Sequence, residues 1–101
     1  MTGHSQADEA LRRARTNPRT AVREGIRWTA GRLEDRFPAD ALTEDALRAV
    51  VRGWAVHVHD WSAETETLAQ QLRAAMPPVR AGVTRDEYAA ALRLALAGVT
   101  P

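Results

Sequence analysis

The chain has 101 residues, of which 45% are hydrophobic, 27% charged and 5% aromatic. These proportions fit one packed domain and exclude the apolar-poor, highly charged composition of a disordered chain. Fourteen basic residues oppose thirteen acidic ones. The resulting net charge of +1 predicts no overall attraction to nucleic acid or to an anionic membrane.

All fourteen basic residues are arginines, which we interpret as the mark of a GC-rich, actinobacterial genome. The chain contains no cysteine, so it has neither a disulfide framework nor a thiolate site. Residues 1–6 are polar, lack the features of a secretory signal, and are predicted to be a flexible tail. Because no apolar run is long enough to cross a bilayer, we expect a cytoplasmic protein with one helical domain over 7–99.

The first half of the chain predicts two helices. Residues 7–16 are good helix formers with acidic residues ahead of arginines, and Asn17-Pro18 ends that segment. Pro18 suits the first position of a second helix. From there to residue 37 the apolar residues recur at spacings of three and four, which predicts a helix over 18–37 that ends before Pro38. These residues are Val22, Ile26, Ala30, Leu33 and Phe37.

Thr43 supplies a cap for a third helix that begins near Glu44. Its apolar residues continue at heptad spacing far beyond one ordinary helix, and one helix over about 44–76 would expose them as a seam for a homodimer. Against this, Asp60, Ser62 and the acidic residues after them resemble a new helix start, so a break near Ser62 is predicted and the continuous helix stays open as the alternative. The seam or core residues are Leu47, Val51, Trp54, Val58, Trp61, Leu68 and Leu72.

The last helix is predicted after Met76-Pro77-Pro78 and a short loop. Thr84 and Glu87 form a capping-box pattern, and an apolar face follows as far as Gly98. No convincing alternating strand occurs. The sequence therefore predicts an all-α fold, a small bundle of four or five helices, with or without the long central helix and its dimer seam.

Motifs for catalysis and cofactor binding are missing. His57, His59 and Asp60 have metal-ligand chemistry, but on a helix the two histidines stand about 200° apart and cannot share a metal. No glycine-rich phosphate loop or nucleophile elbow is present. We therefore expect no enzyme activity, no metal and no cofactor.

Trp28 lies off the apolar stripe of the helix over 18–37, between Arg32 and Glu24 in angle. We expect the helix over 7–16 to fold back and cover it through Leu11, with a protein-binding surface, where tryptophan is enriched, as the alternative. The leading hypothesis is a non-enzymatic protein-interaction or adaptor module of a bacterial cytoplasm, binding another protein or itself. Its candidate partner-binding residues are Trp28, Arg23, Arg27 and Arg32.

The alternative is a small nucleic-acid-binding regulator. Arg19, Arg23 and Arg27 recur every four residues and could follow a phosphate backbone. The acidic start of the helix at Glu44 opposes this, because that helix would have to enter the groove of the nucleic acid. Protein binding is accordingly the preferred hypothesis.

Overall fold

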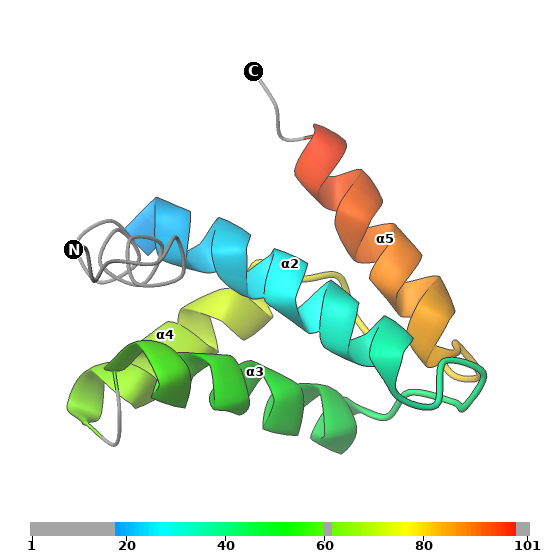
Figure 1. Ribbon diagram of the computed structural model, residues 1–101, viewed down its shortest axis with the longest axis horizontal. Helices are drawn as coiled ribbons and strands as arrows, with labels where there is room; N and C mark the ends of the chain where they lie inside the picture. The colour runs from blue at the N-terminus through cyan, green and yellow to red at the C-terminus, as the bar shows by residue number, and fades with distance from the viewer. Residues whose placement is uncertain (1–17, 60–61, 99–101) are drawn as a thin grey trace, which may run out of the picture.

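The computed structural model describes residues 18–59 and 62–98, which form four α-helices (Figure 1). They are α2 (Pro18–Asp35), α3 (Glu44–His59), α4 (Ala63–Ala74) and α5 (Arg85–Gly98). Within these two ranges the only β-type pairing is an isolated antiparallel bridge between Ala41 and Thr84. The predicted all-α bundle is confirmed. The expected tail over 1–6 and helix over 7–16 lie outside the described residues.

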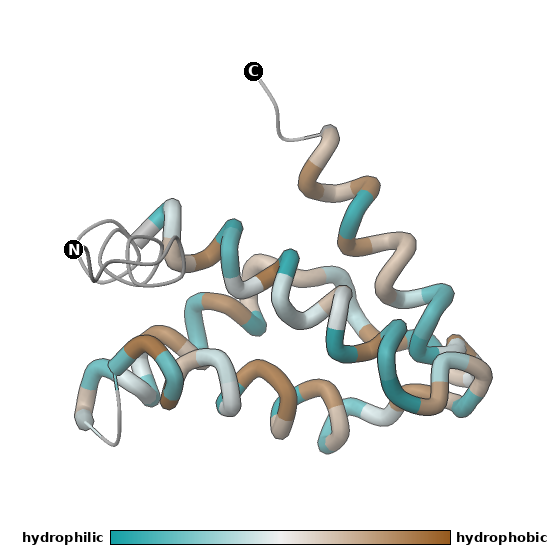
Figure 2. Tube along the Cα trace, viewed as in Figure 1, coloured by the Kyte–Doolittle hydropathy of each residue, from teal (hydrophilic) through white to brown (hydrophobic). Residues whose placement is uncertain are grey.

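α3 and α4 form a helical hairpin, α2 packs across both of its helices, and α5 packs against another side of α2 (Figure 1). Figure 2 shows hydrophobic and hydrophilic residues alternating around the turns of these helices, as amphipathic elements require. The apolar faces meet in one core to which all four helices contribute. Its largest fully buried apolar side chains are Leu33, Leu47, Val51, Val58, Leu72 and Leu92.

The predicted break near Ser62 is confirmed, and the alternative of one helix over 44–76 is wrong. α3 ends at His59 and α4 begins at Ala63. The Ser62 hydroxyl donates a hydrogen bond of 2.9 Å to the His59 carbonyl, and the Ser62 N–H donates to Thr65 Oγ1 at 3.3 Å. Ser62 thus satisfies groups at the end of one helix and at the start of the next, which closes the hairpin.

The residues of the proposed dimer seam lie in the core of this one chain. The hairpin folds the apolar face of α4 back onto that of α3, so their side chains pack against α2 and against one another. Trp61 falls in the gap at 60–61 and is outside the described residues. The buried members are Leu47, Val51, Trp54, Val58, Leu68 and Leu72.

The predicted end of the second helix at Phe37 is wrong by two residues. α2 ends at Asp35, and Phe37 has a φ of +52° with 69% of its surface exposed, instead of joining the buried face. Pro38 clashes with an α conformation at the residue before it, and this local effect outweighs the helical spacing of the apolar residues.

The loop after α2 is fastened to the start of α5. Arg85 donates its backbone N–H to the Asp40 carbonyl and its side-chain Nε to the Arg36 carbonyl, both at 2.9 Å. The predicted capping box is present, since Thr84 N donates to Glu87 Oε1 at 2.8 Å and Glu87 N donates to Thr84 Oγ1 at 3.3 Å. α5 therefore begins at a fixed position beside the C-terminal end of α2.

Among the described residues, no helix combines the length and the apolar character needed to cross a membrane.

Candidate functional site

Trp28 is half-buried at the junction of α2 and α3. Its ring centroid lies 5.9 Å from that of Trp54, with 33° between the ring planes. The ring also covers Gly53, where an added Cβ would stand 3.5 Å from Trp28 Cη2. Trp28 thus rests on α3 and leaves only part of its indole open to solvent.

The position of Trp28 follows from a buried face of α2 that is wider than the apolar spacing predicts. Ala21, Gly25 and Thr29 are buried beside the predicted stripe, because α2 packs against the hairpin on one side and α5 on another. At 100° per residue, these three residues lie around the helix between the apolar stripe and Trp28, so Trp28 stands at the edge of the buried face. Small and polar residues carry little hydropathy signal, so the sequence pattern did not show this extension.

Trp28 belongs to a line of side chains in contact that we call the aromatic row. The Arg32 guanidinium lies over the Trp28 ring, with Cζ 5.5 Å from the centroid, a cation–π geometry. On the other side, the Trp54 ring lies against the exposed His57 ring, with 5.7 Å between the centroids and 41° between the planes. The aromatic row is therefore Arg32, Trp28, Trp54 and His57, with exposed polar groups at both ends and the buried Trp54 between them.

The other predicted partner-binding residues lie on another flank of α2, since at 100° per residue Arg27 stands about 100° and Arg23 about 140° around the helix from Trp28. Arg27 is exposed and forms an ion pair of 2.7 Å with Glu24, whereas Arg23 is half-buried. Of the candidate metal ligands, His57 belongs to the aromatic row and Asp60 lies outside the described residues. Among the residues that are described, no group of three metal-ligating side chains comes together.

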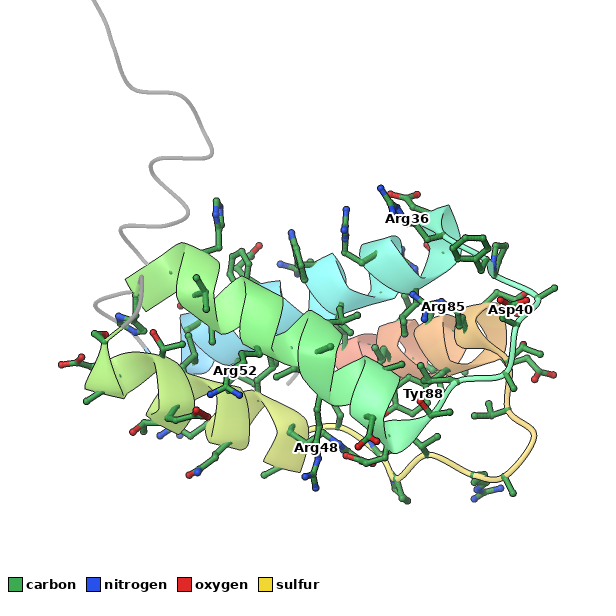
Figure 3. All side chains as sticks on the ribbon, turned by 90° about the horizontal axis from the view of Figure 1, so that it is seen from below. Arg36, Asp40, Arg48, Arg52, Arg85 and Tyr88 are labelled. Atoms are coloured by element: carbon green, nitrogen blue, oxygen red, sulfur yellow. The ribbon has the colours of Figure 1, made fainter. Side chains whose placement is uncertain are left out.

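A second polar site, which sequence reasoning missed, is a groove of about 440 Å³ between α3 and α4. We call it the hairpin groove. Arg48 and Arg52 project from α3 toward this side of the molecule (Figure 3). The groove is lined by Arg48, Val51, Arg52, Glu66, Ala69, Gln70, Arg73 and Ala74.

Ion pairs cross the hairpin groove and its end. Arg52 of α3 pairs with Glu66 of α4. Glu44 accepts two hydrogen bonds of 2.7 Å from Arg73, through Nε and Nη2, and one of 2.9 Å from Arg48 Nε. The bonds from Arg73, with a smaller effect of Arg48, lower the pKa of Glu44 to about 2 although desolvation opposes the shift.

Arg73 also connects this cluster to α5. Its Nη1 donates to the carbonyls of Met76 and Pro77, each at 3.4 Å. The Tyr88 hydroxyl donates to the same Pro77 carbonyl, and burial raises the pKa of this phenol. Arg73 is therefore a structural link among α3, α4 and the connector to α5.

The predicted break at Ser62 was the one sequence signal for the hairpin groove. Once the chain turns back there, the arginines of the polar flank of α3 come to lie beside the polar flank of α4. The partners are 14 positions apart for Arg52 and Glu66 and 29 apart for Glu44 and Arg73. No local motif relates residues at those separations.

No protein-family model, curated protein or solved structure matches the chain.

Proposed function

We propose that this chain is a non-enzymatic protein-interaction module, an adaptor or regulatory partner, that binds an acidic segment of another protein through the aromatic row. The observation that carries the proposal is the half-buried indole of Trp28, fixed on Trp54 and covered on one face by the Arg32 guanidinium. A rigid tryptophan loses little conformational entropy when it binds, and tryptophan and arginine are the residues most enriched at the energetic centres of interfaces.

The Arg32 guanidinium over the Trp28 ring supports an acidic partner. Arg23 and Arg27 face another side of α2 and would form a more distant basic rim, with Glu24 the one acidic residue between Arg23 and Arg32. A carboxylate on the partner can bind Arg32 while an apolar side chain beside it covers the open part of the Trp28 ring. Charges at such a rim set orientation and association rate more than affinity.

The setting that we propose for this module is a bacterial cytoplasm. Support for it is compositional: arginine is used without lysine, and the 101 residues include no cysteine.

Nucleic acid is the alternative partner, through Arg19, Arg23 and Arg27. The ion pair between Arg27 and Glu24 opposes any anion at Arg27, and it weakens this alternative more because a phosphate backbone would depend on all three arginines, whereas the acidic segment binds chiefly at Arg32. The acidic first turn of α3, with Glu44 and Asp45, also opposes the approach of a phosphate backbone. We therefore favour an acidic protein segment.

The test compares affinity capture by the native chain and by an Arg27→Glu, Arg32→Glu double variant, from nuclease-treated lysate of the source organism. These arginines are exposed, so the variant keeps its fold, whereas Trp28→Ala would also remove packing on Trp54. Arg80→Glu is the control, since it reverses one exposed arginine on the connector after α4.

We expect one protein in stoichiometric amount, captured by the native chain and by Arg80→Glu and lost with the double variant. Its binding segment, made as a peptide, is expected to shift the Trp28 indole signal in a nuclear magnetic resonance titration. Equal capture by all three proteins would refute the assignment to the aromatic row. Capture that disappears with nuclease would favour the nucleic-acid alternative, and self-association alone, seen by light scattering, would make a second copy the partner.

A further inference from the structure

The hairpin groove lies apart from the aromatic row. At 100° per residue, Arg48 and Arg52 stand at least about 120° around α3 from Trp54 and His57. The two surfaces are thus on different flanks of the same helix, and a ligand in the groove would leave the aromatic row open. This allows the groove a role of its own, independent of the function proposed above.

Two arginines of the groove keep unused donor capacity. Arg48 uses its Nε for Glu44, and Arg52 uses its Nη2 for Glu66, so each guanidinium has further N–H groups that make no other recorded bond in the described part of the chain. Their side chains are 69% and 55% exposed. Because the two residues are one helical turn apart, their guanidinium groups can approach one ligand from the same side.

The charge balance of the lining favours an anion. Three guanidinium groups line the groove against the single carboxylate of Glu66, and Glu44 at its end is bound by two of them. A ligand with one carboxylate would form ion pairs no stronger than those that Glu44 and Glu66 already make with these arginines. A phosphate monoester carries up to two negative charges and presents three oxygens to the planar forks of arginine, which match phosphate geometry.

Part of the lining of the groove is apolar. It consists of Ala69, Ala74 and the nearly fully buried Val51, and Gln70 adds an amide. The volume of about 440 Å³ lies in the range of small-molecule sites. The ligand should therefore combine a phosphate with a small apolar or aromatic group.

We propose that the hairpin groove binds a small organic phosphate, with its phosphate between Arg48 and Arg52 and its apolar group on Val51 and Ala69. Arg73 stays on Glu44 and holds the two helices at the spacing that the site needs. Glu66 competes with the phosphate for Arg52, so it lowers the affinity and its removal should raise it.

The experiment titrates the full chain with phenyl phosphate at constant ionic strength and follows the amide and arginine Nε signals by nuclear magnetic resonance. We expect saturable shifts confined to α3 and α4. Benzenesulfonate keeps the ring and three oxygens but carries only one negative charge. We expect it to bind about 10-fold more weakly than phenyl phosphate, which is the effect of losing one charge-assisted hydrogen bond. Inorganic phosphate lacks the ring, so it measures how much the apolar lining residues contribute to the affinity, and it should also bind more weakly than phenyl phosphate.

Two variants should move the affinity in opposite directions. Arg52→Gln is expected to weaken phenyl phosphate binding about 10-fold, and Glu66→Gln to strengthen it several-fold by freeing Arg52. Both remove the same exposed ion pair, so an effect through stability alone would change them in the same direction. Arg80→Gln, an exposed arginine outside the groove, is the control and should bind like the native chain.

The proposal is overturned by unsaturable binding, by shifts spread over the arginines of α2, or by equal loss in Arg80→Gln. It is also overturned if Glu66→Gln binds no better than the native chain. Shifts at the arginines of α2 would bear on the nucleic-acid alternative as well, whereas the other outcomes leave the proposal for the aromatic row untouched, so failure of the two proposals can be told apart.

Discussion

The indole of Trp54 lies directly against the backbone of Gly25, so closely that an added Cβ at Gly25 would stand 2.6 Å from Trp54 Cδ1 and 2.7 Å from Leu72 Cδ2. Trp54 Nε1 also donates to the Ala21 carbonyl at 3.3 Å, one turn earlier in α2. The absence of a side chain at Gly25 lets α2 approach the hairpin at this point.

We therefore expect Gly25→Ala to lower the free energy of unfolding by about 1 to 3 kcal/mol, the usual cost of overpacking, although alanine favours a helix. Gly31→Ala is the matched control in the same helix, because nothing lies within 4 Å of a Cβ there. That variant should be more stable by about 0.5 to 1 kcal/mol. Urea denaturation checks both, and equal effects of the two substitutions would contradict the packing described here.

Glu44→Gln should destabilise the protein at neutral pH and not at pH 2. The folded state lowers the pKa of Glu44 from 4.5 to about 2, so the ionised carboxylate stabilises the fold above pH 4.5 and this contribution is lost as the pH falls toward 2. Because the side chain is partly exposed, we expect a loss of only about 1 kcal/mol at pH 7. Stability curves against pH for both proteins measure it.

Asp45→Asn is the control for Glu44→Gln, since it removes an exposed carboxylate from the same first turn of α3. It should change stability less at pH 7. A difference between native protein and Glu44→Gln that stayed constant from pH 7 to pH 2 would show that the ion pairs with Arg73 and Arg48 are not its cause.

Thr29→Val should raise the stability by about 1 kcal/mol. Thr29 is fully buried and its Oγ1 has no hydrogen-bond partner, so valine would keep the shape and remove the cost of desolvating the hydroxyl. Thr65→Val makes the same replacement at a buried threonine whose Oγ1 accepts from the Ser62 N–H, and should lower the stability by about 1 kcal/mol. Thermal unfolding of both variants measures the two changes. Stability changes of the same sign would contradict the difference in hydrogen bonding between the two threonines.

Phe37→Gly should stabilise the fold by about 1 kcal/mol. The φ of +52° suits glycine and is costly for other residues, and the exposed ring contributes little to the core. Phe37→Ala removes the ring and keeps the Cβ, so it should give no such gain. If the alanine variant were stabilised as much as the glycine variant, the ring would be responsible and the backbone conformation would not.

The sequence predicted the helices best where caps and apolar spacing agree. Thr84 with Glu87 marked the start of α5, and Thr43 marked that of α3, because a cap is a local interaction. Heptad spacing could not separate one long helix from a hairpin, since α4 keeps the same apolar period on its way back. The cap pattern at Ser62 favoured a break, and the structure decides the question, because α3 ends at His59 and α4 begins at Ala63.

The candidate sites were less accessible to sequence reasoning. Trp28 was recognised as unusual, but its contact with Gly53 depends on how α2 crosses α3. The pairing of Arg52 with Glu66 arises only after the hairpin closes. Such tertiary contacts join residues whose separation in the chain carries no periodic signal.

α5 runs beside α2 and not beside α3 or α4, so only one of the other described helices supports it along its length. An arrangement of this kind divides the molecule into a cooperative unit of α2, α3 and α4 and a C-terminal unit that can open by itself. In native-state hydrogen exchange the amides of α5 would then exchange through a sub-global opening, at a lower free energy than those of the hairpin. Release of α5 would uncover the side of α2 on which it packs.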